Sequence, residues 1–338
     1  MKDEPAGPIL DIQDLSIDID DARVVDGFSL KIGRGEIVAL VGESGCGKSL
    51  TAMALLRLLP KGASMPGGRI LLKGTDMAVL SERAMRRLRG ESISVIFQEP
   101  TASLDPLATV GSQIEEALCI HRPVSGSAAR KAAIEMLNSV GIPDPERRMG
   151  QYPFELSGGM CQRIMIAIAL ICEPLVLIAD EPTTALDVTI QAQILDLMRN
   201  LVSARGTSIL LITHDMGVVA ATAHRVVVMY AGRIAEIASV DALFHAPAHP
   251  YTAMLLASVP RLDATPKRHL ATIDGLVPSP FEFPLGCRFA GRCPLTRERC
   301  HEEAPPLAPP PPAFPDAERV TACWYADEVP SIRETANG

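Results

Sequence analysis

The chain has 338 residues, of which 47% are hydrophobic and 21% are charged, and its formal net charge is −8. This length allows one large α/β domain with a smaller one, or two modest domains. The negative charge disfavours a general nucleic-acid binder, because binding to a phosphate backbone depends on clustered lysine and arginine. The compact basic cluster Arg86-Arg87-Leu88-Arg89 is therefore interpreted as the solvated face of a helix.

No segment of the sequence is long and apolar enough to cross a bilayer. The most apolar stretch, Ile164 to Ala179, is interrupted by Glu173-Pro174. It falls short of the roughly 20 residues that a membrane-spanning helix needs. The first residues also lack the basic start and apolar core of a signal peptide. We therefore expect a cytoplasmic protein whose contact with a membrane is peripheral.

Short apolar runs alternate with helical patterns along the chain, as in a parallel α/β sheet. The predicted strands are Ile37–Val41, Ser92–Phe97, Leu175–Ala179, Ser208–Thr213 and Val226–Tyr230. Four of these five strands end beside a motif described below. Ligands of open α/β sheets bind beyond the carboxyl ends of the strands, so this arrangement predicts a binding site there.

Two segments depart from this alternation. Between about Pro106 and Pro153 the strand signal disappears, and Ala128–Val140 has apolar residues at helical spacing, which predicts a mainly helical insertion. After about Pro260 the composition changes to frequent proline and clustered cysteine. The proline run Ala304–Pro315 predicts an extended surface segment, because proline suits neither a helix interior nor a central strand.

A glycine-rich motif directly follows the first predicted strand. It matches G-x-x-x-x-G-K-[ST] and reads Gly42-Glu43-Ser44-Gly45-Cys46-Gly47-Lys48-Ser49, followed by Leu50. The glycines allow the backbone N–H groups to point at phosphate oxygens, and a helix beginning near Lys48 adds its positive end. We expect Lys48 to reach the β- and γ-phosphates of ATP and the Ser49 hydroxyl to bind Mg²⁺.

The strand Leu175–Ala179 delivers two adjacent carboxylates, Asp180 and Glu181. Successive side chains of an extended segment point in opposite directions, so the two carboxylates can have different roles. Asp180 is placed to hold Mg²⁺ through water, and Glu181 is placed to polarise the attacking water. A strand that ends in Asp-Glu is common in proteins. The assignment of these two carboxylates to ATP hydrolysis depends on their position downstream of a phosphate-binding loop.

Here the sequence resembles the ABC ATPase family. Leu156-Ser157-Gly158-Gly159-Met160-Cys161-Gln162-Arg163 is similar to the signature motif of that family. Ser157 can cap a helix that runs to about Ile171, with Gly158 and Gly159 leaving room for a phosphate. The resemblance implies that Ser157, Gly158, Gly159 and Gln162 close over an ATP held by a partner subunit, in a head-to-tail dimer with two ATP molecules.

Three single residues match further motifs of the family, in the family's order. Gln98 stands at the position of the family's glutamine that contacts Mg²⁺ and senses the membrane subunit. Asp187 matches the loop that communicates across the dimer. His214 matches the switch histidine near the γ-phosphate. The sequence departs from the family at the adenine, since Asp18–Arg23 offers no aromatic residue for stacking. Arg23 is a guess for the residue that holds the base.

The resemblance is closest to the oligopeptide/dipeptide (and nickel) import branch. It is carried by Ile96–Pro106, by Asp180–Thr189 and by His249-Pro250-Tyr251-Thr252. It implies a heterodimer with a second, homologous ATPase, two permease subunits and an extracytoplasmic solute-binding protein, with no nucleic-acid partner. It places the chain at the cytoplasmic face of the inner membrane.

Eight cysteines divide into two groups. Cys46, Cys119, Cys161 and Cys172 are scattered and are interpreted as isolated thiols, whereas Cys287, Cys293, Cys300 and Cys323 cluster near the end. The second group is similar to the tail of peptide-importer ATPases, in which four cysteines can hold a [4Fe–4S] cluster. Their spacing matches neither common zinc sites nor ferredoxins, so iron–sulfur, zinc and no metal remain open, with iron–sulfur favoured.

Together these patterns predict an α/β P-loop NTPase fold with a RecA-like parallel-sheet core. Residues 1–259 form the nucleotide-binding domain, with a helical signature subdomain at about 106–165, and residues 260–338 form the cysteine-containing extension. The expected function is ATP hydrolysis that energises solute import, with peptides favoured. Import of nickel or another small solute, a regulatory subunit without ATPase activity, and a soluble ATPase acting on DNA or ribosomes are the alternatives.

Overall fold

The computed structural model describes residues 7–183, 188–259, 272–312, 314, 316 and 318–330. The chain forms two compact units, each assembled from three segments. Unit 1 comprises Met1–Asp11, Lys31–Ile37 and Leu71–Ile212, and unit 2 comprises Ile12–Leu30, Val38–Ile70 and Thr213–Gly338. Within the described residues, none of the helices has the length and hydropathy needed to span a bilayer.

Unit 1 contains three parallel strands that the sequence predicted to within two residues. They are β6 (Ile93–Ile96), β7 (Val176–Asp180) and β8 (Ser208–Ile212), with β7 between the other two. All residues of β7 and β8 are buried. A strand of a parallel sheet is covered on both faces, so it appears in the sequence as an unbroken apolar run. Because the three strands run the same way, their carboxyl ends lie along one edge.

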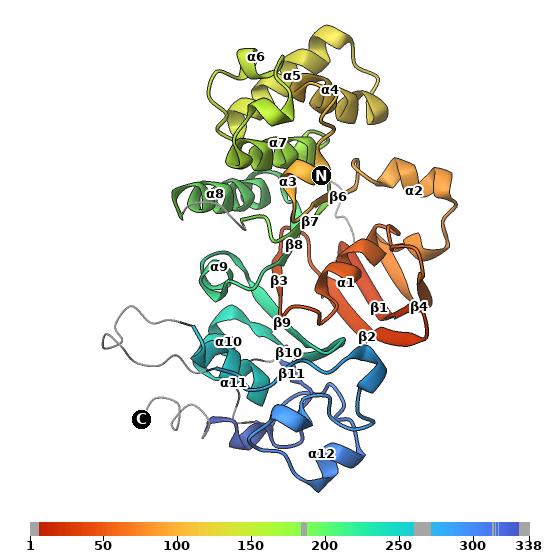
Figure 1. Cartoon of the computed structure of the whole chain (residues 1–338), viewed down its shortest axis with the longest axis vertical. Coiled ribbons are helices and arrows are strands. Elements are labelled where there is room, and N and C mark those ends of the chain that lie inside the picture. The colour runs from red at the N-terminus through yellow and green to blue at the C-terminus, as the bar shows by residue number, and fades with distance from the viewer. Residues whose placement is uncertain are drawn as a thin grey trace. The chain divides into compact units, whose positions relative to one another are not determined.

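The predicted helical insertion is confirmed in unit 1. Its main helices α4 (Val110–His121), α5 (Gly126–Ser139) and α7 (Gly158–Leu170) pack against one another (Figure 1). The hydroxyl group of the N-cap residue of each helix accepts a hydrogen bond from a backbone N–H in the first turn. The N-cap residues are Thr109 for α4, Ser125 for α5 and Ser157 for α7. The remaining helices are α2 (Glu82–Leu88), α3 (Pro100–Ser103), α6 (Pro145–Arg148), α8 (Val188–Arg205) and the short η1 (Met77–Val79) and η2 (Pro153–Glu155).

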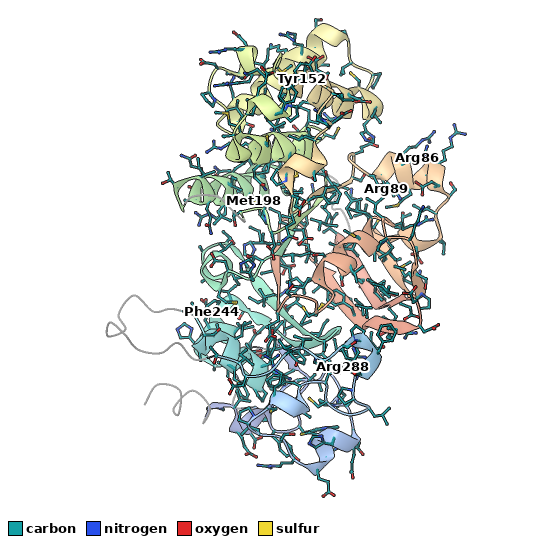
Figure 2. All side chains as sticks on the ribbon, in the orientation of Figure 1. Arg86, Arg89, Tyr152, Met198, Phe244 and Arg288 are labelled. Atoms are coloured by element: carbon teal, nitrogen blue, oxygen red, sulfur yellow. The ribbon has the colours of Figure 1, made fainter. Side chains whose placement is uncertain are left out.

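The basic cluster lies on α2, as expected for a solvated helix face. Arg86 projects from this helix with 78% of its side chain exposed (Figure 2). Arg86 and Arg89 both pair with Glu82, and Arg89 does so at 2.6 Å. These charges are therefore satisfied within the helix and its immediate end.

Unit 2 contains a second group of strands, in the order β11-β10-β9-β3. The strands β3 (Ile37–Val41) and β9 (Arg225–Tyr230) are parallel, as predicted. The strands β10 (Arg233–Ser239) and β11 (Val320–Thr321) are antiparallel to their neighbours and were not predicted. The turn between β9 and β10 has two residues of positive φ, a geometry that matches the twist of a tight hairpin.

A further antiparallel sheet was missed by the sequence analysis. It contains β2 (Ala22–Ile32), β1 (Leu10–Ile19) and β4 (Ala63–Leu72) in that order, and β5 (Thr75–Asp76) pairs with the end of β4. Buried and exposed positions alternate along much of β2. Its apolar residues are therefore interrupted by polar ones, which weakens the signal of an unbroken apolar run.

The helices of unit 2 are short, and its C-terminal part is mostly irregular. The helices of unit 2 are α1 (Lys48–Leu55), α9 (Met216–Thr222), α10 (Val240–His245), α11 (Pro250–Ala257), α12 (Glu298–Glu302), η3 (Pro280–Glu282), η4 (Ala290–Arg292) and η5 (Ala326–Glu328). The described part of the proline run Ala304–Pro315 contains no helix and makes one bridge, from Ala308 to Thr321, as expected for an extended segment.

A buried ion pair ties this C-terminal part to β10. Glu236 and Arg319 both have fully buried side chains, and the Arg319 Nε donates to Glu236 Oε1 at 3.0 Å. The same carboxylate accepts the backbone N–H groups of Ala248 at 2.9 Å and His249 at 3.0 Å. One carboxylate therefore connects three segments of unit 2.

Candidate functional site

The glycine-rich loop connects β3 to α1, and α1 begins at Lys48 as predicted. Gly42, Gly45 and Gly47 have φ angles of 151°, 80° and 101°. A Cβ atom on Gly42 would lie 2.1 Å from the carbonyl oxygen of Met229. Only glycine fits at that position, and the resulting backbone curve is the kind that lets successive N–H groups converge on an anion.

The side chain of Lys48 is hydrogen-bonded to the backbone of this loop. Its ammonium donates to the carbonyl oxygens of Gly42 at 2.8 Å and Glu43 at 2.9 Å. Within the loop, Ser44 and Gly45 are exposed, Ser49 and Leu50 are half-buried, and Cys46 is buried. Burial raises the pKa of the Cys46 thiol, so this side chain stays neutral inside the loop.

Two predicted site residues meet at the carboxyl ends of β6 and β7 in unit 1. The side-chain amide of Gln98 donates to Glu181 Oε2 at 3.1 Å. Glu181 has left the strand conformation, with a φ of 49°, and its backbone N–H donates to Ile212 O at 2.9 Å. Asp180, the last residue of β7, is buried with 7% of its surface exposed. The two adjacent carboxylates therefore have different environments, and their different roles stay a prediction.

The signature motif forms the start of α7. Ser157 accepts a hydrogen bond from the Met160 N–H at 3.4 Å, and the helix extends to Leu170 with Ile171 as its C-cap. Ser157 and Gly158 are exposed, and a Cβ on Gly158 would meet nothing within 4 Å. The helix N-terminus is therefore accessible for an anion, as the sequence predicted.

Gln162 and Gly159 are less accessible than these two residues. Gln162 has 1% of its surface exposed, and its amide donates to Pro182 O at 2.7 Å. Gly159 is half-buried. The side chain of Gln162 thus connects α7 with the segment after β7, within unit 1, through its hydrogen bond to Pro182 O.

His214 belongs to unit 2 and is exposed. It lies between β8 and α9, where the next residue, Asp215, caps α9 by accepting from the N–H groups of Gly217 and Val218. Asp187 lies outside the described residues, so its predicted place in a dimer loop stays a prediction.

Comparison with known proteins identifies the family. A model described as "ABC transporter" matches residues 25–184, and one described as "Oligopeptide/dipeptide transporter, C-terminal region" matches residues 235–300. A probable peptide ABC transporter ATP-binding protein of Sinorhizobium fredii is 50% identical, and the match covers 96% of this chain and 97% of that protein. This chain belongs to the ATP-binding subunits of ABC transporters.

Other relatives agree. The dipeptide transport ATP-binding protein DppD of Bacillus subtilis is 51% identical, over 90% of both chains, and that of Escherichia coli is 45% identical, over 88% of this chain and 92% of its own. Among solved structures, the ATP-binding cassette MJ0796 bound to ADP and Pi matches with a TM-score of 0.63 and 26% identity. That match covers 68% of this chain and 98% of the cassette. The fold is therefore that of an ABC ATPase cassette, and the subunit is an ATPase.

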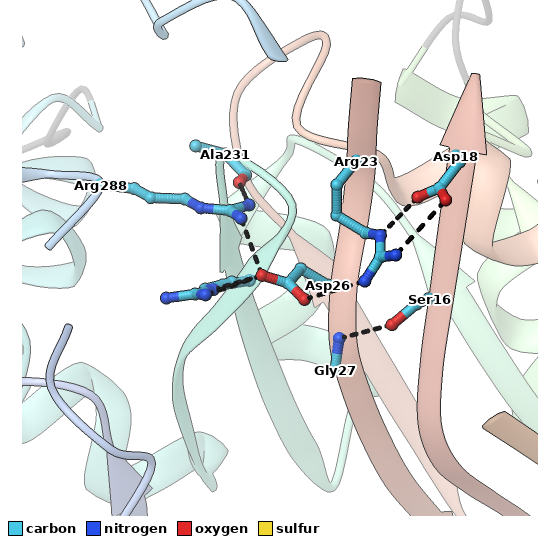
Figure 3. Close-up of polar contacts among 8 residues, drawn as sticks. Ser16, Asp18, Arg23, Asp26, Gly27, Ala231 and Arg288 are labelled. Carbon is cyan, nitrogen blue, oxygen red and sulfur yellow. Dashed lines mark hydrogen bonds and ion pairs between the residues drawn. The ribbon is translucent and has the colours of Figure 1, made fainter. Parts of the chain in front are cut away.

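The strand segment where adenine contacts were expected carries a charge network (Figure 3). Arg23 pairs with Asp18 and lies 3.7 Å from Asp26. Asp26 also accepts from Arg233 at 2.7 Å and from Arg288 at 2.8 Å. Burial alone would raise the pKa of Asp26, but the arginines outweigh it and hold that pKa below its usual range. The Arg23 side chain of this ATP-binding subunit is thus shared between two carboxylates.

The four C-terminal cysteines line one small cavity of about 20 Å³ in unit 2. Burial raises the pKa of Cys293 to about 11 and that of Cys323 to about 12, and the neighbouring thiols add to both shifts. Cys287, Cys293 and Cys323 are half-buried and Cys300 is buried. Among the described residues, however, no three of His, Cys, Asp or Glu are placed to hold a single metal ion. The cysteines converge as predicted, but not into the ligand set of one ion.

Two residues that contact the phosphate-binding loop were not predicted from the sequence. Tyr251 accepts the backbone N–H of Glu43 at 2.9 Å, and Arg292 donates to the Glu43 carboxylate at 2.9 Å. Tyr251 belongs to a segment that resembles importers, but nothing local in the sequence connects either Tyr251 or Arg292 with a loop more than 200 positions away. Both residues belong to unit 2, as the loop does.

Proposed function

We propose that this ATPase subunit energises import of oligopeptides or dipeptides. The observation that carries the proposal is the match of residues 235–300 to the C-terminal region of oligopeptide/dipeptide transporters, together with relatives named for peptide import that align over about nine-tenths of the chain or more. Import of nickel or another small solute is the competing assignment, since the ATPase of such a system does not itself contact the solute.

Within one chain, the residues described above have complementary roles in ATP hydrolysis. Lys48 would leave its carbonyl partners and neutralise the β- and γ-phosphates, while the glycine-rich loop, Gly42 to Ser49, holds them through backbone N–H groups. The oxygen atoms of Ser49, Asp180 and Gln98 are ligands of the kind that Mg²⁺ prefers. Glu181 orients the attacking water, and His214 contacts the γ-phosphate.

Each site is completed by a second subunit. The exposed N-terminus of α7 at Ser157 and Gly158 presents backbone donors and a positive helix end, which suits the γ-phosphate of an ATP bound to another cassette. We expect this partner to be a homologous ATPase, giving a heterodimer, with Asp187 in the loop between the two sites. Residues 1–259 of this chain would form its nucleotide-binding domain, and residues 260–338 would form its C-terminal extension.

The partners beyond the ATPase pair are two permease subunits and an extracytoplasmic solute-binding protein. The subunit would then lie at the cytoplasmic face of the inner membrane, held by the permeases. Closure of the ATPase pair around ATP would drive the permeases between their facing states, and hydrolysis would reset them.

The C-terminal cysteines are proposed to hold a [4Fe–4S] cluster. Four thiols that line one cavity are the right number and chemistry, and the Tyr325 N–H already donates to the Cys323 sulfur at 3.4 Å. A zinc ion needs all its sulfur ligands within about 2.3 Å of one point, whereas a cluster spreads its thiolates over different iron atoms. A cavity of about 20 Å³ holds about one water molecule, so the cysteine segments must move apart to admit a cluster.

Reconstitution tests the transport assignment. The ATPase pair, permeases and binding protein would be assembled in lipid nanodiscs, and ATP hydrolysis would be measured with dipeptides, longer peptides or Ni²⁺ added. Stimulation by peptides is expected. Stimulation by Ni²⁺ alone would assign the system to metal uptake, and purification of the chain with ribosomes or DNA instead of permeases would move it to a different class of ABC ATPase.

A further inference from the structure

We propose that Arg292 is a positioning residue for ATP binding: with Tyr251 it holds Glu43, and through Glu43 the phosphate-binding loop, in the shape that accepts the triphosphate. The inference rests on ATP binding at this loop and not on which solute is transported. All the residues involved belong to unit 2.

Glu43 places a negative charge inside a loop that binds a strongly negative ligand. Its Oε2 accepts from Arg292 Nη1 at 2.9 Å, and 27% of its side chain is exposed. Its Oε1 is buried and has no hydrogen-bond partner among the described residues. Arg292 is therefore the cation that neutralises this carboxylate. Without it, a partly buried charge would be left unpaired beside the phosphates, which is costly.

Arg292 is itself held rigidly. Its Nε donates to Asp274 O at 2.8 Å, its Nη2 donates to Ile273 O at 3.0 Å, and its Nη1 also reaches the Tyr230 hydroxyl at 3.3 Å. Only 8% of its side chain is exposed. A planar guanidinium with each of its nitrogen atoms engaged fixes both the position and the direction of the bond to Glu43. A mobile arginine on the surface would not fix the position of Glu43, because forming the pair would cost it side-chain entropy.

Tyr251 fixes the backbone at the same residue. Its ring is fully buried in a cluster with Tyr230 and Phe289, at centroid distances of 4.8 and 5.4 Å. Burial raises the pKa of the Tyr251 hydroxyl, so it remains a neutral group that accepts the Glu43 N–H at 2.9 Å. The second residue of the loop is therefore held by its main chain and by its side chain, from two different elements.

The two anchors come from segments outside the loop motif. Tyr251 lies on α11, and Arg292 ends η4, directly before Cys293. Gly42, next to Glu43, also packs closely against Met229 of β9, and its φ of 151° is one that side-chain-bearing residues rarely adopt. Glycine adopts this conformation without strain, but it also has the largest conformational freedom of any residue, so it does not by itself hold the loop in one shape. Arg292 and Tyr251 restrict the backbone at the next residue, Glu43.

The test uses the full-length chain with Arg292→Ala, Arg292→Lys and Tyr251→Phe, and measures the dissociation constant of Mg·ATP together with thermal unfolding. A lost hydrogen bond to a charged group predicts about tenfold weaker ATP binding for Arg292→Ala. Arg292→Lys keeps the charge but loses the planar fork, so its affinity should lie between those of the wild type and the alanine variant. In the assembled transporter, KM for ATP should rise while kcat changes much less.

A matched control and a double-mutant cycle separate positioning from folding. Arg297 lies on the same extension and pairs with Glu328 at 2.6 Å, but half of its side chain is exposed, so Arg297→Ala should leave ATP affinity unchanged. If Arg292 acts through Glu43, adding Arg292→Ala to Glu43→Gln should cause little further loss.

Each outcome decides the matter. Unchanged ATP affinity in a folded Arg292→Ala variant, or effects of Glu43→Gln and Arg292→Ala that multiply, would overturn the proposal. If the alanine variant does not fold, the lysine and Tyr251→Phe variants decide it, and wild-type affinity in both would overturn it. A wild-type chain that binds no ATP would instead refute the ATP site, and this inference with it.

Discussion

The side-chain amide of Gln98 donates a hydrogen bond of 3.1 Å to the carboxylate of Glu181, across the carboxyl ends of two adjacent parallel strands. Gln98 must therefore rearrange its contact with Glu181 if it is to bind Mg²⁺. The residue proposed to bind the ion and the residue proposed to orient the attacking water are thus directly hydrogen-bonded.

Glu181→Gln is expected to keep ATP binding and to slow hydrolysis by about 10² to 10⁴-fold, the usual contribution of a positioned base. An amide is nearly the same size as the carboxylate but does not accept a proton from water. The dimer should therefore remain closed around ATP, which size-exclusion chromatography with ATP would detect.

Glu99→Gln is the matched control for this variant. Glu99 is exposed, adjoins Gln98 in the sequence, and makes no side-chain bond to the helix that it precedes. Its replacement should leave turnover unchanged. Equal turnover in Glu181→Gln and the wild type would remove Glu181 from the role of base.

Gly42→Ala should impair both folding and ATP binding. Its Cβ would lie 2.1 Å from Met229 O, at a φ of 151° that side-chain-bearing residues rarely adopt. Left-handed backbone alone costs an L-residue roughly 1–2 kcal/mol, and the clash adds to that. We expect a melting temperature lower by several degrees and weaker binding of ATP. Gly67→Ala, where a Cβ would meet nothing within 4 Å, should change neither quantity.

The parts of the fold that the sequence predicted are those with purely local signals. The strands β3, β7 and β8 consist of five buried residues each, so their apolar runs are unbroken, and each precedes a recognisable motif. By contrast, alternating burial weakened the signal of β2, and the two residues of β11 are too few to form a pattern.

The contacts that complete the site are long-range, and no local pattern contains them. Arg292 and Glu43 are 249 positions apart, and Tyr251 and Glu43 are 208 apart. Either residue alone appears ordinary in the sequence. The motif predicts that the loop binds phosphate, but which side chains support the loop depends on how the C-terminal segments pack against β9.

The buried pair between Glu236 and Arg319 should be important for the stability of unit 2. Glu236→Gln would leave the Arg319 charge without its counter-ion in a fully buried position, a loss of about 3–5 kcal/mol. Denaturant unfolding would measure it. The pair between Glu318, whose side chain is 76% exposed, and the half-buried Arg225, at 3.6 Å, is the control, and Glu318→Gln should change the free energy of unfolding by less than about 0.5 kcal/mol. A similar cost for both variants would mean that burial does not govern these pairs.

The cysteine cavity gives the last prediction. Protein purified without oxygen is expected to be brown, with about four iron and four sulfide per chain. Cys300→Ser removes the buried thiol of the four and should abolish the visible absorption, whereas Cys119→Ser, an exposed cysteine of α4, should leave it intact. In the absence of a cation the thiols of Cys293 and Cys323 are neutral, because burial, with a smaller contribution from the neighbouring thiols, raises their pKa values. A positive cluster core would reverse this balance and deprotonate them. Assembly should therefore release protons, and a colourless protein that contains zinc, or no metal at all, would contradict the iron–sulfur assignment.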